Sequence, residues 1–142
     1  MKDTLNMEIL SKPQNEGFAR AAVAAFVARL NPTLEEINDI KTAVSEAVTN
    51  SVVHAYSNEE GLIHIGIEIE EKRVTITIAD DGEGIEDIVK AREPLFTTKP
   101  DEERSGMGFT FMELFMDGLE VYSVKGKGTT IKMVKQIGGN EK

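Results

Sequence analysis

Glu46, Asn50 and His54 lie four positions apart in a segment whose apolar residues repeat at helical spacing. Residues separated by four project from the same face of an α-helix, so a carboxylate, an amide and an imidazole would line up along one side. A carboxylate can act as a general base, and Mg²⁺ accepts an amide oxygen as a ligand. The alternative is an ordinary solvated helix face, and the spacing alone does not decide between the two.

Asp80 ends an apolar strand pattern and is followed by Gly82 and Gly84. Glycines allow the backbone to pass close to a flat ligand. A carboxylate there can accept a hydrogen bond from the amino group of adenine, whereas guanine would present an acceptor oxygen to it. The segment therefore predicts adenine recognition, with a plain Asp-Gly turn as the simpler alternative.

Gly106, Met107 and Gly108 precede a third group of apolar residues with helical spacing. Free backbone N–H groups and the helix dipole at such a start can hold phosphate oxygens, although many Gly-x-Gly segments are plain junctions. The preceding loop adds hydroxyl and cationic side chains that could close over a triphosphate, at Thr97, Thr98, Lys99, Arg104 and Ser105.

Composition excludes several classes of function. The 25 acidic side chains outnumber the 16 basic ones, giving a net charge of -9 that repels a nucleic-acid backbone. The chain has no cysteine, no Walker-type phosphate loop and no metal-ligand spacing around His54 and His64, so zinc is not expected. It also shows no membrane-length apolar run and no signal sequence, which predicts a cytoplasmic protein without membrane contact.

The elements that must position these residues follow from periodicity. We expect a strand over residues 5–9, then a helix that starts near Ser11 as capping residue and buries Phe18, and that ends at Asn31 before Pro32. Thr33 and Glu36 form the signature of a capping box, which predicts a long second helix continuing to about Tyr56.

The second half reads as two hairpins separated by a long loop and a helix. Alternation predicts strands over residues 63–69, 74–78, 119–124 and 129–136, with a helix over 108–117. The predicted fold class is α+β: a two-layer sandwich with helices on one face of a mixed, mostly antiparallel sheet. One domain over residues 1–137 and a loose tail over 138–142 complete the organisation.

In this order, the three motifs resemble the N, G1 and G2 boxes of the GHKL ATPase superfamily, whose fold is of the Bergerat type. The resemblance runs from about residue 13 to residue 134. Residues 45–56 and 94–100 look like those of the small anti-sigma serine kinases, most of all the anti-sigma F branch, with the stress-response anti-sigma B kinases next.

The resemblance implies an ATP/ADP site in which Asn50 binds Mg²⁺ through its amide oxygen, Asp80 recognises adenine and Glu46 is the catalytic base. Arg104 is the candidate for stabilising charge on the γ-phosphate. The remaining positions implied to bind ATP are Gly82, Gly84, Thr97, Thr98, Lys99, Ser105, Gly106, Met107, Gly108 and Thr130.

The family also implies partners. A homodimer would hold a sigma factor, here sigma F, and would phosphorylate an anti-anti-sigma protein on serine, with Glu16 and Arg20 docking these partners. One alternative is a histidine-kinase catalytic domain, which requires a helical phosphoacceptor hairpin. Another is a nucleotide-gated binding module without kinase activity, against which Glu46 argues because nucleotide storage needs no base.

Overall fold

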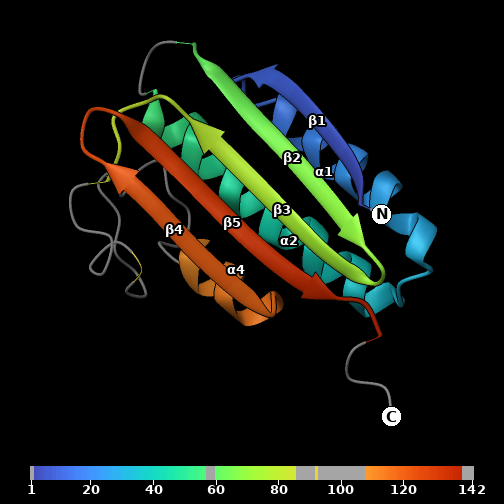
Figure 1. The fold of residues 1–142 in the computed structure, drawn as a ribbon. Helices are drawn as coiled ribbons and strands as arrows, with labels where there is room; N and C mark the ends of the chain where they lie inside the picture. The colour runs from blue at the N-terminus through green and yellow to red at the C-terminus, as the bar shows by residue number, and fades with distance from the viewer. Residues whose placement is uncertain (1, 57–59, 86–91, 93–107, 139–142) are drawn as a thin grey trace.

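The computed structural model describes residues 2–56, 60–85, 92 and 108–138. Five strands form one sheet of order β1-β2-β3-β5-β4, and every described strand pair is antiparallel. The helices α1, α2 and α4 all cover the same face of the sheet (Figure 1). This confirms the predicted α+β sandwich, whose described sheet is antiparallel throughout.

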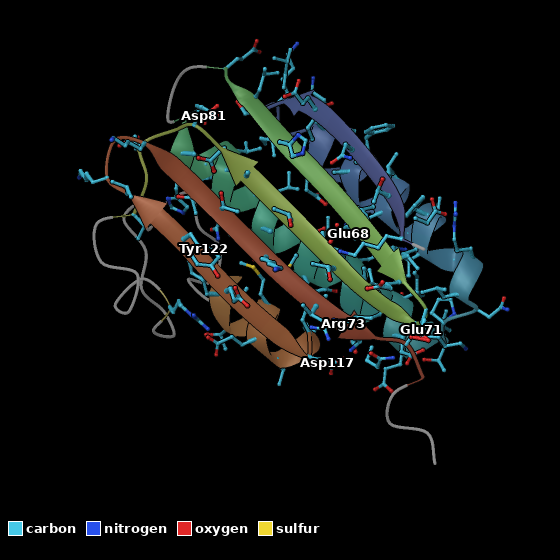
Figure 2. The ribbon with its side chains drawn as sticks, viewed as in Figure 1. Glu68, Glu71, Arg73, Asp81, Asp117 and Tyr122 are labelled. Carbon is cyan, nitrogen blue, oxygen red and sulfur yellow. The ribbon has the colours of Figure 1, made fainter. Side chains whose placement is uncertain are left out.

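The strands lie where alternation predicted them. They are β1 Asp3–Leu10, β2 Leu62–Glu70, β3 Arg73–Asp80, β4 Gly118–Val124 and β5 Gly128–Gln136. Along β2 and β3 the isoleucines are buried under the helices, because successive side chains point to opposite faces. The other face stays polar and open, and Figure 2 shows Glu68 and Tyr122 on it.

The start of α1 Asn15–Val27 differs from the prediction. Its N-terminal cap is Gln14, which makes no capping hydrogen bond through its side chain. The predicted cap, Ser11, is instead buried, and its hydroxyl accepts a hydrogen bond from the Gly61 N–H at 2.9 Å. Ser11 thus ties the end of β1 to the chain entering β2.

The buried face of α1 also differs from the prediction. Ala19, Val23 and Val27 are fully buried, whereas Phe18, expected in the core, is 58% exposed. A short 3-10 turn, η1 Ala28–Leu30, follows, and Asn31 ends it in the left-handed conformation at φ 52°. The predicted stop before Pro32 is confirmed.

The second helix, α2 Leu34–Asn50, begins with the predicted capping box. The Thr33 hydroxyl accepts from the Glu36 N–H at 3.0 Å, and the Glu36 carboxylate accepts from the Thr33 N–H at 2.8 Å. After Asn50 the chain continues as a π-helix, η2 Ser51–Ala55, so the predicted helix extends as far as expected but changes its winding. Such π segments are frequent at functional sites.

The third described helix, α4 Gly108–Phe115, packs against α2. Phe109, Met112 and Met116 join the core between the helices and the sheet. None of the helices in the described ranges is long and apolar enough to cross a bilayer. The predicted nucleotide-covering loop, residues 93–107, lies outside those ranges.

Candidate functional site

The first residue of α4 lies directly against the polar side chains of α2. A Cβ placed on Gly108 would be 3.3 Å from Glu46 Oε1 and 3.7 Å from Asn50 Oδ1. Both side chains are half-buried, so they line a helix junction and not a fully solvated face. Glycine lets the positive end of α4 approach the carboxylate and the amide closely.

Asn50 carries an unsatisfied polar group at this junction. Its Nδ2 is buried and has no hydrogen-bond partner among the described residues. An unpaired buried donor costs about 1–3 kcal/mol, which a bound ligand would recover. Because the two ends of an amide can be interchanged by rotation, Asn50 can equally offer its oxygen to a cation.

Magnesium fits this amide, although the protein alone does not form a complete metal site. The described residues contain no cluster of three or more His, Cys, Asp or Glu side chains that could hold a metal. Mg²⁺ is commonly bound by one or two protein ligands together with substrate phosphates and water. A magnesium ion held by Asn50 would take its other ligands from the phosphates of the nucleotide and from water.

Asp80 is oriented by hydrogen bonds to both of its carboxylate oxygens. The Ser51 hydroxyl donates to Oδ2 at 2.8 Å, and the Gly82 N–H donates to Oδ1 at 3.0 Å. Burial raises the pKa of the Asp80 carboxyl, and the neighbouring Asp81 adds to this, while the two donors act in the opposite direction. The carboxylate is therefore held in place at a partly desolvated strand end.

The loop after Asp80 is fixed by close backbone packing. A Cβ on Gly82 would lie 2.3 Å from the Ala55 carbonyl oxygen, and the Glu83 N–H donates to that oxygen at 2.9 Å. Gly84 has φ +76°, and a Cβ there would lie 2.2 Å from the Val124 carbonyl oxygen. These two glycines are thus required for contact between backbone segments.

Sequence reasoning missed two residues of this region. Ser51 contacts Asp80, and the Tyr56 hydroxyl donates to the Leu62 carbonyl at 2.7 Å and accepts from the Asp81 N–H at 2.8 Å. Their only signal in the sequence is proximity to Asn50. His54, the third predicted polar residue of the helix face, lies within η2 between them.

The structure does not bring the Thr130 side chain to Asp80. Thr130 pairs with Ala79 on β3, so alternation directs its side chain to the open face of the sheet. Thr129 is buried opposite Asp80, and its backbone acts to lower the pKa of the Asp80 carboxyl. The other predicted nucleotide contacts lie outside the described residues: Thr97, Thr98, Lys99, Arg104, Ser105, Gly106 and Met107.

Glu16 and Arg20, predicted to dock partners, form an ion pair on α1 with 3.4 Å between Oε2 and Nη1. The Ser45 hydroxyl on α2 hydrogen-bonds to both side chains. Ser45 directly precedes Glu46, so this charged pair on the surface of α1 contacts α2 one residue before the candidate base.

The sequence of this chain is similar to those of known ATPase-domain proteins. Residues 9–135 match the model of the histidine kinase-like ATPase domain. The protein of Clostridium botulinum named anti-sigma F factor is 61% identical over 137 residues, covering 96% of each chain. The anti-sigma F factor of Caldanaerobacter subterraneus is 59% identical over 136 residues, covering 96% of this chain and 95% of the relative.

The chain belongs to the anti-sigma F factor family. It therefore carries an ATP-binding domain of the GHKL type. A blue-light activated histidine kinase of Erythrobacter litoralis superposes with a TM-score of 0.60 at 19% identity, over 85% of this chain and 41% of that kinase. That likeness establishes the shared fold.

Proposed function

We propose that this protein is an ATP-dependent anti-sigma factor that inhibits a sigma factor of the sigma F type and phosphorylates an anti-anti-sigma antagonist on serine. The observation that carries the proposal is the junction of α2 and α4, where Gly108 lies against Glu46 and Asn50. Asp80 belongs to the same region, because Ser51, the residue after Asn50, hydrogen-bonds to it.

Phosphoryl transfer depends mainly on positioning and electrostatic stabilisation, and the described residues suit those tasks. Asp80 orients the adenine, while the first turn of α4 supplies backbone N–H groups to the phosphates. Mg²⁺ held by Asn50 would neutralise phosphate charge. Glu46 accepts the proton of the attacking serine hydroxyl from its position one helical turn before Asn50.

The loop before α4 completes the site in this proposal. Arg104 stabilises charge on the γ-phosphate, with Lys99, Thr97, Thr98 and Ser105 as further phosphate contacts. The support for these assignments is the family membership and the position of Gly108, the residue that follows the loop in the sequence, against Glu46.

The partners belong to the same proposal. The named relatives support a sigma factor of the F type over the B type. Glu16 and Arg20 form the docking charges, and their contact with Ser45 gives a route by which nucleotide binding near Glu46 could be sensed on α1. A cytoplasmic homodimer completes the proposal, and sedimentation velocity tests the dimer.

The test is to incubate the protein with Mg²⁺, ATP labelled at the γ-phosphate and a candidate antagonist. We expect label on a serine of the antagonist. Asn50→Asp and Asp80→Asn should weaken ATP binding, whereas Glu46→Gln should bind ATP nearly normally and lose most of the serine phosphorylation. Equal loss of ATP binding in all three variants would contradict the separate roles.

A nucleotide-gated module without kinase activity is the second candidate. It is favoured by one observation, the unpartnered Asn50 amide, which calls for a ligand but does not require a reaction. Tight binding of ATP and of the sigma factor without any transfer to the antagonist would establish it and would rule out the kinase.

A further inference from the structure

The orientation of the Asp80 carboxylate is restricted by the hydrogen bonds that it accepts within the protein. An ionised carboxylate offers about four lone-pair sites on two oxygens. The Ser51 hydroxyl occupies one on Oδ2, and the Gly82 N–H occupies one on Oδ1. Thr129 pairs with Asp80 across the sheet, and its backbone favours the ionised carboxylate. The direction in which a remaining lone pair points is therefore fixed by these donors.

Ser51 differs from Gly82 because it donates through its side chain. A substitution can therefore remove this hydrogen bond without changing the backbone. It is 2% exposed and is the first residue of the π-helix, immediately after Asn50. The Gly82 N–H belongs to the turn that follows Asp80, and Thr129 is paired with Asp80 across the sheet. Among the described hydrogen bonds to the carboxylate, that of Ser51 is the one that connects it to the helical segment carrying Glu46 and Asn50.

We propose that Ser51 is a specificity-determining residue: its hydroxyl holds the Asp80 carboxylate in the orientation that accepts a hydrogen bond from the 6-amino group of adenine. The inference rests on the proposed ATP function. Ser51 acts through Asp80, which its hydroxyl contacts, so it is a positioning residue.

The effect of Ser51 on adenine binding can be distinguished from an effect on folding. Removing the hydroxyl leaves the Gly82 N–H to hold Oδ1 while Oδ2 loses its donor, so Asp80 gains freedom to turn away from the base. The loss then concerns only the interaction with the 6-amino group. A purine nucleotide without that group has nothing to lose when Asp80 turns.

The experiment compares MgATP with the Mg²⁺ complex of purine riboside triphosphate, which lacks the 6-amino group, by calorimetric titration. We expect the wild-type protein to prefer ATP. Ser51→Ala should weaken ATP binding about tenfold, in keeping with the loss of a hydrogen bond to a charged group, and should leave the analogue's affinity nearly unchanged.

Two further variants serve as controls. Thr42→Ala removes a hydroxyl from the middle of α2, away from Asp80, and it should leave the ATP preference intact. Ser51→Cys keeps a side chain of similar size with a weak donor, so it should reduce the preference even if the alanine variant folds poorly.

Equal weakening of ATP and the analogue, or an unchanged ATP preference in both Ser51 variants, would overturn the inference while leaving ATP binding established. A wild-type protein that bound neither nucleotide would overturn the proposed function itself. The two failures are thus distinguishable in a single set of titrations.

Discussion

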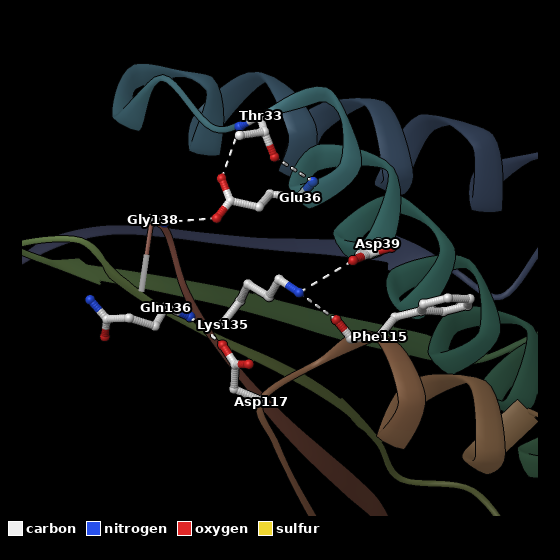
Figure 3. Close-up of polar contacts among 8 residues, drawn as sticks. All are labelled: Thr33, Glu36, Asp39, Phe115, Asp117, Lys135, Gln136 and Gly138. Carbon is white, nitrogen blue, oxygen red and sulfur yellow. Dashed lines mark hydrogen bonds and ion pairs between the residues drawn. The ribbon is translucent and has the colours of Figure 1, made fainter. Parts of the chain in front are cut away.

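The two ends of α2 differ in how completely their polar groups are satisfied within the protein. At the N-terminal end, the capping box and the chain after β5 form a closed set of hydrogen bonds (Figure 3). At the C-terminal end, Asn50 keeps a buried donor without a described partner, and Ser51, the next residue, contacts Asp80. One helix thus joins an end built for stability to an end built for a ligand.

Glu36 shows how the stable end is closed. One of its carboxylate oxygens accepts from the Thr33 N–H, and the other accepts from the Gly138 N–H at 2.7 Å. Gly138, predicted as the start of a loose tail, is therefore held. Burial acts to raise the pKa of Glu36, but these donors outweigh it and lower the pKa, the reverse of the outcome at Asp80.

Lys135, on β5, contacts both α4 and the N-terminal half of α2. Its Nζ donates to the Phe115 carbonyl at 2.7 Å, at the end of α4, and lies 3.4 Å from Asp39 Oδ2 on α2. Its side chain is only 12% exposed. Lys135 therefore ties α4 to α2 at the end away from Gly108.

The largest expected effect is on the rate of serine phosphorylation, which should depend on the C-terminal end of α2 and not on its N-terminal end. Glu46→Gln should reduce serine phosphorylation by about 10²–10⁴-fold with ATP affinity largely kept, because the amide cannot accept the proton. Glu36→Gln, the same change at the stable end, should leave the transfer rate intact. Single-turnover kinetics at saturating ATP measures both, and similar rates for the two variants would break the comparison.

The next effect concerns backbone packing at the ligand end. Gly82→Ala should lower the free energy of unfolding by about 2–3 kcal/mol, because the new methyl meets the Ala55 carbonyl. Gly17→Ala on α1 has room for its methyl and should raise stability by about 0.5–1 kcal/mol. Urea denaturation compares them, and equal stability of the two variants would contradict the described loop packing.

Lys135→Met should destabilise the protein by about 1–3 kcal/mol, since it leaves Asp39 and the Phe115 carbonyl without their shared donor. ATP affinity should change little, because the proposed site lies at the other end of α2. Lys132→Met, on an exposed position of the same strand, is the matched control. A variant of Lys135 that kept its stability and lost ATP binding would reverse the assignment of the two ends.

The smallest effect is a stability gain. Burial raises the pKa of Asp80, so its ionisation opposes folding at neutral pH. Asp80→Asn should therefore raise the free energy of unfolding by less than about 1 kcal/mol, a modest figure because water screens the site. It should also weaken ATP binding.

The sign of its pH dependence follows from the raised pKa. The gain should be full above the folded-state pKa of Asp80 and should fade as acidification approaches the unfolded value, since the wild-type carboxyl then binds a proton and loses its penalty. Chemical denaturation of both proteins at several pH values checks this. A gain that grew on acidification would contradict the account.

Much of the fold could be predicted because local rules agreed with tertiary packing. Alternating isoleucines defined β2 and β3, and Thr33 with Glu36 marked the start of α2. Which face of α1 is buried could not be predicted, because its alanines occur on every side of the helix and do not mark one apolar face. Phe18 was assigned to the core because its spacing matches a helical apolar stripe, and the structure exposes it.

The candidate site was proposed from the sequence as a set of motifs, whereas its contacts come from the structure. Asn50, Asp80 and Gly108 were identified by residue type and spacing. The role of Ser51 depends on where the π-helix meets the end of β3, a tertiary relation that no local spacing encodes. Thr129, and not Thr130, faces Asp80, because the strand register decides which side chain points inward.

The most direct test of the central claim is the response of the Asn50 side-chain amide to MgATP, followed by nuclear magnetic resonance with Gly138 as the reference at the other end. The account predicts a large shift of the Asn50 side-chain and Gly108 backbone signals on titration, with the Gly138 signal unchanged. A shift at Gly138 with the Asn50 amide unaffected would show that the nucleotide binds elsewhere.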